Sequence, residues 1–112
     1  MPKQQMGEPF ERIDVEEGKQ FLDGNRLTWI DVREPAEWQA GHIPGATLVP
    51  LNHLLLSPRK YLQGDSIVFY CAQGVRSAVA CEVAAAIGLG QIYNLEGGIQ
   101  DWVARGFPVV TS

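Results

Sequence analysis

Cysteine and histidine are scarce in this sequence. Among its 112 residues there are two cysteines, Cys71 and Cys81, and two histidines, His42 and His53. A small secreted domain stapled by disulfides normally has more cysteines. The spacing also lacks the Cys-x-x-Cys pair that is typical of a zinc site. We therefore expect reduced thiols, and we expect neither a metal nor any other cofactor.

Basic residues and long apolar runs are also few. The chain has 9 Lys and Arg residues against 13 Asp and Glu, a net charge of -4. A nucleic-acid-binding surface is normally basic, so we expect no nucleic-acid partner. No apolar run approaches the roughly 20 residues of a membrane-spanning helix, and residues 1–14 show no signal-peptide core. We expect no membrane association and a cytoplasmic location, and the sequence leaves the oligomeric state open.

The chain length fits one domain, which we place at residues 10–112 after a flexible terminus at 1–9. Short apolar runs predict five strands, and alanine-rich or capped segments between them predict helices. This alternation favours an α/β domain with a parallel sheet that helices cover on both faces. The predicted strands are 10–13, 27–31, 46–49, 66–70 and 92–95, and the predicted helices are 15–22, 35–40, one or two within 51–63, 77–87 and 97–106.

Cys71 stands directly after the predicted strand 66–70, in the sequence "CAQGVRS". Ligands of doubly wound sheets bind at the carboxyl ends of the strands. Backbone N–H groups in a tight loop, together with those of the next helix, can bind an anion and lower the pKa of a thiol. Arg76 could steady the thiolate or hold an anionic substrate. From this spacing alone, an inert buried thiol is an equal alternative.

Three motifs resemble those of the rhodanese family in its single-domain form: "DVREPAEWQAGHIPGA", "YCAQGVRSAVA" and "NLEGGIQDW". They occur in the family's order and spacing, and the similarity covers nearly the whole chain. The resemblance implies a three-layer α/β/α fold with a five-stranded parallel sheet. It implies that Cys71 is the sulfur-accepting nucleophile. It also implies that the following loop binds the substrate and stabilises a persulfide, through Ala72, Gln73, Gly74, Val75, Arg76 and Ser77.

The chemistry that this resemblance implies is a two-step covalent exchange. The Cys71 thiolate takes a sulfane sulfur from a donor, and the persulfide then passes the sulfur to a thiol or to cyanide. The donor would be a small anion such as thiosulfate or a persulfide-donating protein.

Two alternatives stay open. Some thiosulfate-active members of the family carry a basic residue where Ala72 stands, so the chain could be a protein-to-protein persulfide carrier with little thiosulfate activity. A cysteine-dependent phosphatase or arsenate reductase would need five residues between cysteine and arginine. Four separate Cys71 from Arg76, and this spacing disfavours that activity.

Other polar and aromatic residues have simpler interpretations. Asp31 and Arg33 could form an ion pair near the loop, in which Asp31 orders a neighbouring segment. His42 in "GHIPGA" is expected to bond to backbone in a turn, and Cys81 is expected to pack within its helix. The three tryptophans are expected to be core aromatics: Trp29, Trp38 and Trp102.

Overall fold

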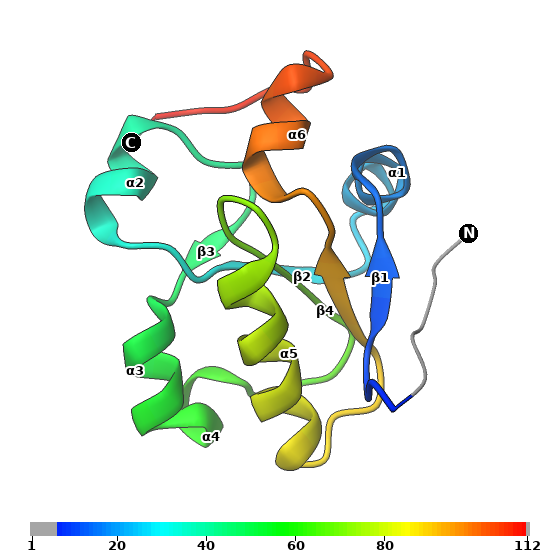
Figure 1. The fold of residues 1–112 in the computed structure, drawn as a ribbon, viewed down its shortest axis with the longest axis vertical. Coiled ribbons are helices and arrows are strands. Elements are labelled where there is room, and N and C mark those ends of the chain that lie inside the picture. The colour runs from blue at the N-terminus through cyan, green and yellow to red at the C-terminus, as the bar shows by residue number, and fades with distance from the viewer. Residues whose placement is uncertain (1–6, 112) are drawn as a thin grey trace.

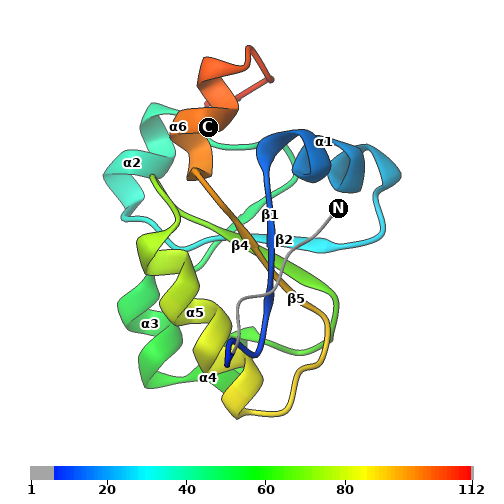
Figure 2. The ribbon, with the colours of Figure 1, turned by 45° about the vertical axis from the view of Figure 1, so that its right-hand side comes forward.

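The computed structural model describes residues 7–111, which form a three-layer α/β/α domain (Figures 1 and 2). The predicted flexible terminus at 1–9 lies mostly outside the described residues. The elements are, in chain order, β1 (Glu11–Ile13), α1 (Val15–Gly24), β2 (Thr28–Asp31), α2 (Pro35–Ala40), β3 (Thr47–Leu48), α3 (Leu51–Leu56), α4 (Pro58–Tyr61), β4 (Ile67–Tyr70), α5 (Val75–Ala86), β5 (Ile92–Leu95) and α6 (Gly98–Ala104).

The five strands form one sheet in the order β1-β5-β4-β2-β3, and every neighbouring pair is parallel. The predicted fold class is confirmed. β4 lies in the middle, and all four of its residues are buried because the sheet is covered on both faces. Parallel strands end on the same edge, so the segments that follow β2, β4 and β5 gather there.

Two hydrophobic clusters hold the layers together. One lies under α3 and α5 and includes Leu54, Ala80 and Phe69. The other lies under α1 and α6 and includes Trp29 and Trp102. Figures 1 and 2 show α3, α4 and α5 on one side of the sheet and α1 and α6 on the other.

The start of α1 follows from its capping residues. The side chain of Asp14 accepts a hydrogen bond from the Glu17 backbone at 2.8 Å, and the Glu17 side chain accepts one from the Asp14 backbone at 3.1 Å. Gly18 is unfavourable for a helix, but a Cβ there would lie 2.7 Å from Leu95 Cδ1. Glycine therefore allows α1 to lie close to the sheet.

The helix after the cysteine begins earlier than predicted. α5 starts at Val75 rather than at Ser77, because Gly74 adopts a left-handed conformation (φ 95°) that turns the chain directly into the helix. Arg76 therefore lies in the first helical turn rather than at the end of a loop. The helix is also less buried than expected, since Val75 is 71% exposed and Val79 is 39% exposed.

One of the three aromatic predictions is wrong. Trp29 and Trp102 are core residues, whereas Trp38 is only half-buried. The Trp38 ring stacks on the His42 ring with the two centroids 3.5 Å apart. The Trp38 side chain, on the short helix α2, packs against the turn at His42 rather than against the sheet. Within residues 7–111, no helix has the length and apolar character to cross a bilayer.

Candidate active site

Cys71 occupies the position directly after the central strand β4. Its side chain is buried, and its Sγ accepts hydrogen bonds from the backbone N–H groups of Gly74 at 3.1 Å and Ser77 at 3.4 Å. The Ser77 hydroxyl oxygen also lies 3.4 Å from Sγ. The loop thus curls around the sulfur, because Gly74 supplies the left-handed turn that aims both amides inward.

These contacts act in opposite directions on the ionisation of the thiol. Burial raises the pKa of Cys71. Hydrogen bonds from the Ser77 hydroxyl and from the amides of Ser77, Gln73 and Gly74 lower the pKa, and the net result lies below the ordinary value. A larger fraction of Cys71 is therefore thiolate at neutral pH than for an ordinary cysteine. The thiolate is the nucleophilic form.

Asn94 on β5 holds the cradle from behind. The Ser77 hydroxyl donates to Asn94 Oδ1 at 2.6 Å, and Asn94 Nδ2 donates to the Gly74 carbonyl at 3.1 Å. Both ends of the turn are thus fixed to the neighbouring strand. Asn94 was not predicted from the sequence, although an amide in the buried strand "IYNL" was a signal.

The amino end of α6 closes the other side of the loop. The backbone N–H groups of Ile99 and Gln100 donate to the carbonyls of Cys71 at 2.9 Å and Ala72 at 3.2 Å. The Gln73 side chain also donates to the Gln100 side chain at 3.0 Å. These backbone amides of the first turn of α6, which have no partner within the helix, hold the loop in place.

Gly98 makes this close approach feasible. Its φ is 59°, and a Cβ there would lie 2.4 Å from the Ala72 carbonyl oxygen. The role of Gly98 was also missed, and the glycine pair in "EGGIQ" was its sequence signal.

Arg76 is held by Glu37 of α2. Its two terminal nitrogens donate to the two carboxylate oxygens at 2.8 and 3.0 Å, a forked ion pair that is partly exposed. The guanidinium lowers the pKa of Glu37 to about 2, assisted by the hydrogen bond from the Glu34 backbone at 2.9 Å. Glu37 was not predicted from the sequence, because it stands 39 residues before Arg76.

Asp31 and Arg33 form a buried ion pair at the end of β2. Arg33 Nη2 donates to Asp31 Oδ2 at 2.8 Å, and Arg33 Nε lies 3.0 Å from both carboxylate oxygens. The same Arg33 Nη2 also donates to the Gly41 carbonyl at 2.7 Å. The pair therefore ties the turn after α2 to the edge of the sheet. In that turn, His42 Nδ1 lies 3.0 Å from the Trp38 carbonyl, as expected for a histidine bonded to backbone.

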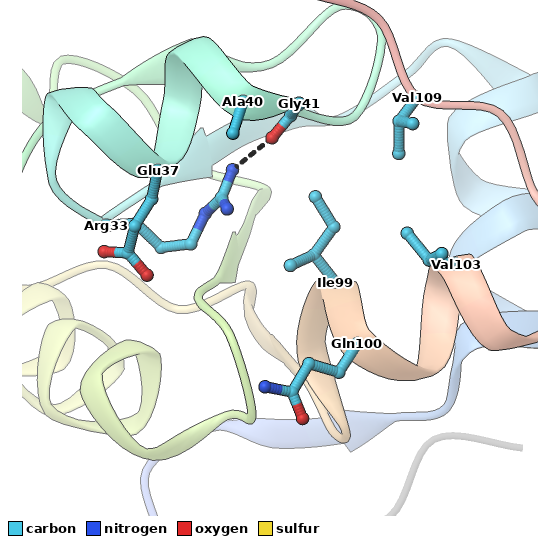
Figure 3. A pocket seen from close by; sticks show the side chains of 8 residues that line it. All are labelled: Arg33, Glu37, Ala40, Gly41, Ile99, Gln100, Val103 and Val109. Carbon is cyan, nitrogen blue, oxygen red and sulfur yellow. Dashed lines mark hydrogen bonds between the residues drawn. The ribbon is translucent and has the colours of Figure 1, made fainter.

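A groove opens beside the loop, between α2 and α6 (Figure 3). Its volume is about 520 Å³. It adjoins the cradle, because Glu37 binds Arg76 and Gln100 binds Gln73. Most of its surface is aliphatic, and its lining residues are Arg33, Glu37, Ala40, Gly41, Ile99, Gln100, Val103 and Val109.

The second cysteine belongs to the core. Cys81 is buried on α5 with its thiol 3.6 Å from the Tyr93 carbonyl, and burial raises its pKa. Both cysteines are free thiols. Across residues 7–111, no cluster of three or more His, Cys, Asp and Glu side chains could hold a metal ion.

Known proteins resemble this chain in sequence and fold. Residues 14–105 match the model of the rhodanese-like domain. A sulfurtransferase of Allochromatium vinosum is 35% identical, covering 88% of this chain and 92% of its own length. YrkF of Bacillus subtilis, named as a candidate sulfur carrier, is 31% identical. The alignment covers 83% of this chain but only 51% of the length of YrkF.

Solved structures agree with the family match. The crystal structure of a rhodanese-related protein from Thermoplasma volcanium has a TM-score of 0.78 and 32% identity, and the alignment covers 90% of this chain and 98% of that one. The matched domain spans most of the described residues, including the Cys71 loop, β5 and α6. The chain belongs to the rhodanese-like family.

Proposed function

We propose that this chain is a sulfurtransferase that carries sulfane sulfur as a persulfide on Cys71. The observation that carries the proposal is the pair of backbone N–H groups, from Gly74 and Ser77, that point at the Cys71 sulfur. Such a nest suits a sulfur that alternates between thiolate and persulfide, since both forms are anionic at neutral pH. The family membership supports sulfur transfer in general terms.

The loading step is a displacement at sulfur. With thiosulfate, the Cys71 thiolate attacks the outer sulfur, a new S–S bond forms, and the bond between that sulfur and the sulfonate sulfur breaks. The bonding electrons leave with sulfite, so the total charge stays at three negative units. Amides that are already aimed at the sulfur need little rearrangement as the charge moves outward.

The unloading step has the same form. A thiolate or cyanide attacks the outer sulfur of the persulfide, and the Cys71 thiolate leaves with the bonding electrons. The products are a persulfide on the acceptor, or thiocyanate. We propose a thiol as the acceptor in the cell, and the cytoplasmic location remains a prediction.

A persulfide carrier is the second candidate. Ala72 brings no charge to the loop, and Arg76 is already paired with Glu37. Both features favour a donor other than a small dianion. The phosphatase or arsenate reductase alternative would be favoured instead by turnover of an aryl phosphate that depends on Cys71.

Thiocyanate production from thiosulfate and cyanide tests the proposal. We expect Cys71→Ser to lose activity by at least about a hundredfold, because the other thiol among the described residues, Cys81, lies in the core and hydroxyl groups are poor nucleophiles toward sulfur. Cys81→Ser, which removes the core thiol, is the matched control and should retain Cys71-dependent turnover. Full activity in Cys71→Ser would contradict the mechanism.

A further inference from the structure

Two arginines lie at the edge of the sheet where the Cys71 loop stands, and a carboxylate compensates each of them. Arg33 is paired with the buried Asp31, and Arg76 is paired with Glu37 through both of its terminal nitrogens. Glu37 also has a pKa of about 2, so it stays ionised at every pH at which the protein would work. An incoming anion therefore meets two neutralised pairs rather than two open cations.

The geometry points to Glu37 as a specificity-determining residue that directs Cys71 toward persulfides carried on organic thiols and away from small inorganic dianions. This inference rests on the proposed function. A dianion such as thiosulfate gains most from an unpaired arginine, because a planar guanidinium can bind two oxygens at once. Here the Glu37 carboxylate occupies that fork.

A persulfide donor depends less than thiosulfate on an unpaired Arg76 guanidinium. At neutral pH the donor is at most the monoanion R–S–S⁻, in equilibrium with its protonated form R–S–SH, and the Cys71 thiolate attacks the outer sulfur of the protonated form. The S–S bond breaks, R–S⁻ leaves with the electron pair, and Cys71 retains S–SH, so one negative charge is present before and after.

The groove beside the Glu37–Arg76 ion pair also favours an organic persulfide as the donor. Its aliphatic wall, which includes Ile99, Val103 and Val109, can contact an organic carrier, and the arginine in its lining, Arg33, is already paired with Asp31 (Figure 3).

Glu37→Gln separates charge from structure. Glutamine keeps an oxygen that can accept the hydrogen bond of the Glu34 backbone, so the start of α2 is preserved. The same oxygen can still accept from Arg76 Nη1, whereas the amide nitrogen cannot accept from Nη2 and the negative charge is removed. The change therefore leaves Arg76 in place with an uncompensated charge beside the loop. The matched control is Glu16→Gln, which breaks another exposed pair with arginine, Arg105, on the α1–α6 side of the molecule.

The experiment measures single-turnover loading of Cys71, followed by acid quench and intact mass. The donors are thiosulfate and the persulfide of 2-mercaptoethanol, whose organic part is uncharged. We expect Glu37→Gln to raise the ratio of the two loading rate constants, thiosulfate over persulfide, by roughly three- to tenfold, as expected for one partly exposed charge acting on a dianion. The gain should lie mainly in the apparent thiosulfate affinity, and high salt should reduce it.

A double-mutant cycle identifies the route of the effect. If Glu37 acts by neutralising Arg76, the gain disappears when Arg76→Gln is already present. An unchanged donor ratio in Glu37→Gln, or an equal gain with and without Arg76, overturns the inference. These failures are distinct from failure of the proposed function, in which Cys71 gains no sulfur from either donor in any variant.

Discussion

At the residue scale, the reactivity of Cys71 depends on a few donors that oppose its burial. Ser77 contributes both its backbone N–H and its hydroxyl, which has a single proton and two neighbours. The closer neighbour is Asn94 Oδ1 at 2.6 Å, and the sulfur lies at 3.4 Å. The hydroxyl thus couples the ionisation of the thiol to the strand behind it.

Removing that hydroxyl should make Cys71 less acidic. In Ser77→Ala we expect the pKa of Cys71 to rise, because a hydroxyl that can turn its proton from Asn94 to the thiolate is lost while burial is unchanged. The remaining amides limit the effect, so the alkylation rate by iodoacetamide at pH 7 should fall about two- to fivefold. The measurement is the alkylation rate as a function of pH. Ser57→Ala, at the distant start of α4, is the control, and identical profiles for both variants would show that the amides alone set the pKa.

The residues within the loop could be predicted because they are contiguous in the sequence. The apolar run 66–70 predicted where the strand ends. The segment directly after it contains Cys71, Gly74 and Arg76, and the glycine predicted a turn. Glu37 and Asn94 could not be predicted in this way, because they reach the loop from α2 and β5. Their contacts exist only after the sheet has brought distant segments to one edge.

At the element scale, the loop and α6 support each other through backbone hydrogen bonds. The helix start at Val75 was predicted two residues late, at Ser77. The structure instead uses the left-handed Gly74, without any side-chain cap. The sequence showed that the chain could turn at Gly74, but it did not show that the helix would begin directly after this turn.

Gly98→Ala should separate α6 from the loop. The added Cβ would meet the carbonyls of Cys71 and Ala72 at 2.5 and 2.4 Å, and backbone cannot yield as a side chain can. We expect a loss of about 2–4 kcal/mol in the free energy of unfolding, measured by urea denaturation. We also expect slower sulfur loading of the fraction that remains folded.

The control for this prediction is Gly106→Ala. Gly106 also has positive φ (78°), but a Cβ there has no neighbour within 4 Å. Its cost should be limited to backbone strain, about 1 kcal/mol. Equal losses in the two variants would contradict the claim that Gly98 is required for close contact.

At the scale of the whole molecule, sheet topology decides which segments meet. The parallel α/β architecture followed from alternating strand and helix patterns and from the family resemblance. The strand order β1-β5-β4-β2-β3 could not be predicted, because a short apolar run does not show which other strand it pairs with. That order places β2 and β5 on either side of β4, and so brings Asp31, Cys71 and Asn94 to one edge.

The Glu37–Arg76 ion pair should also contribute to the stability of the whole domain, in a way that depends on pH. The pKa of Glu37 is about 2 in the folded protein, below its ordinary 4.5. A lowered pKa stabilises the folded state above pH 4.5, and this contribution is lost as pH falls toward 2. Because the pair is partly exposed, its worth is at most about 1 kcal/mol.

Glu37→Gln should therefore flatten the acid dependence of thermal unfolding. We expect the Tm of the variant to fall less steeply than that of the parent between pH 5 and pH 2, with the difference reduced by salt. Calorimetry across this range is the measurement. Parallel curves at low salt would mean that the ion pair contributes nothing to stability.

The most direct test of a Cys71 persulfide is the intact mass of the protein after exposure to a sulfur donor. After thiosulfate or a small organic persulfide, followed by desalting, the mass should increase by one sulfur atom. The increase should disappear with cyanide or a dithiol, be absent in Cys71→Ser and remain in Cys81→Ser. No increase with either donor, or an increase that persists in Cys71→Ser, would contradict the account.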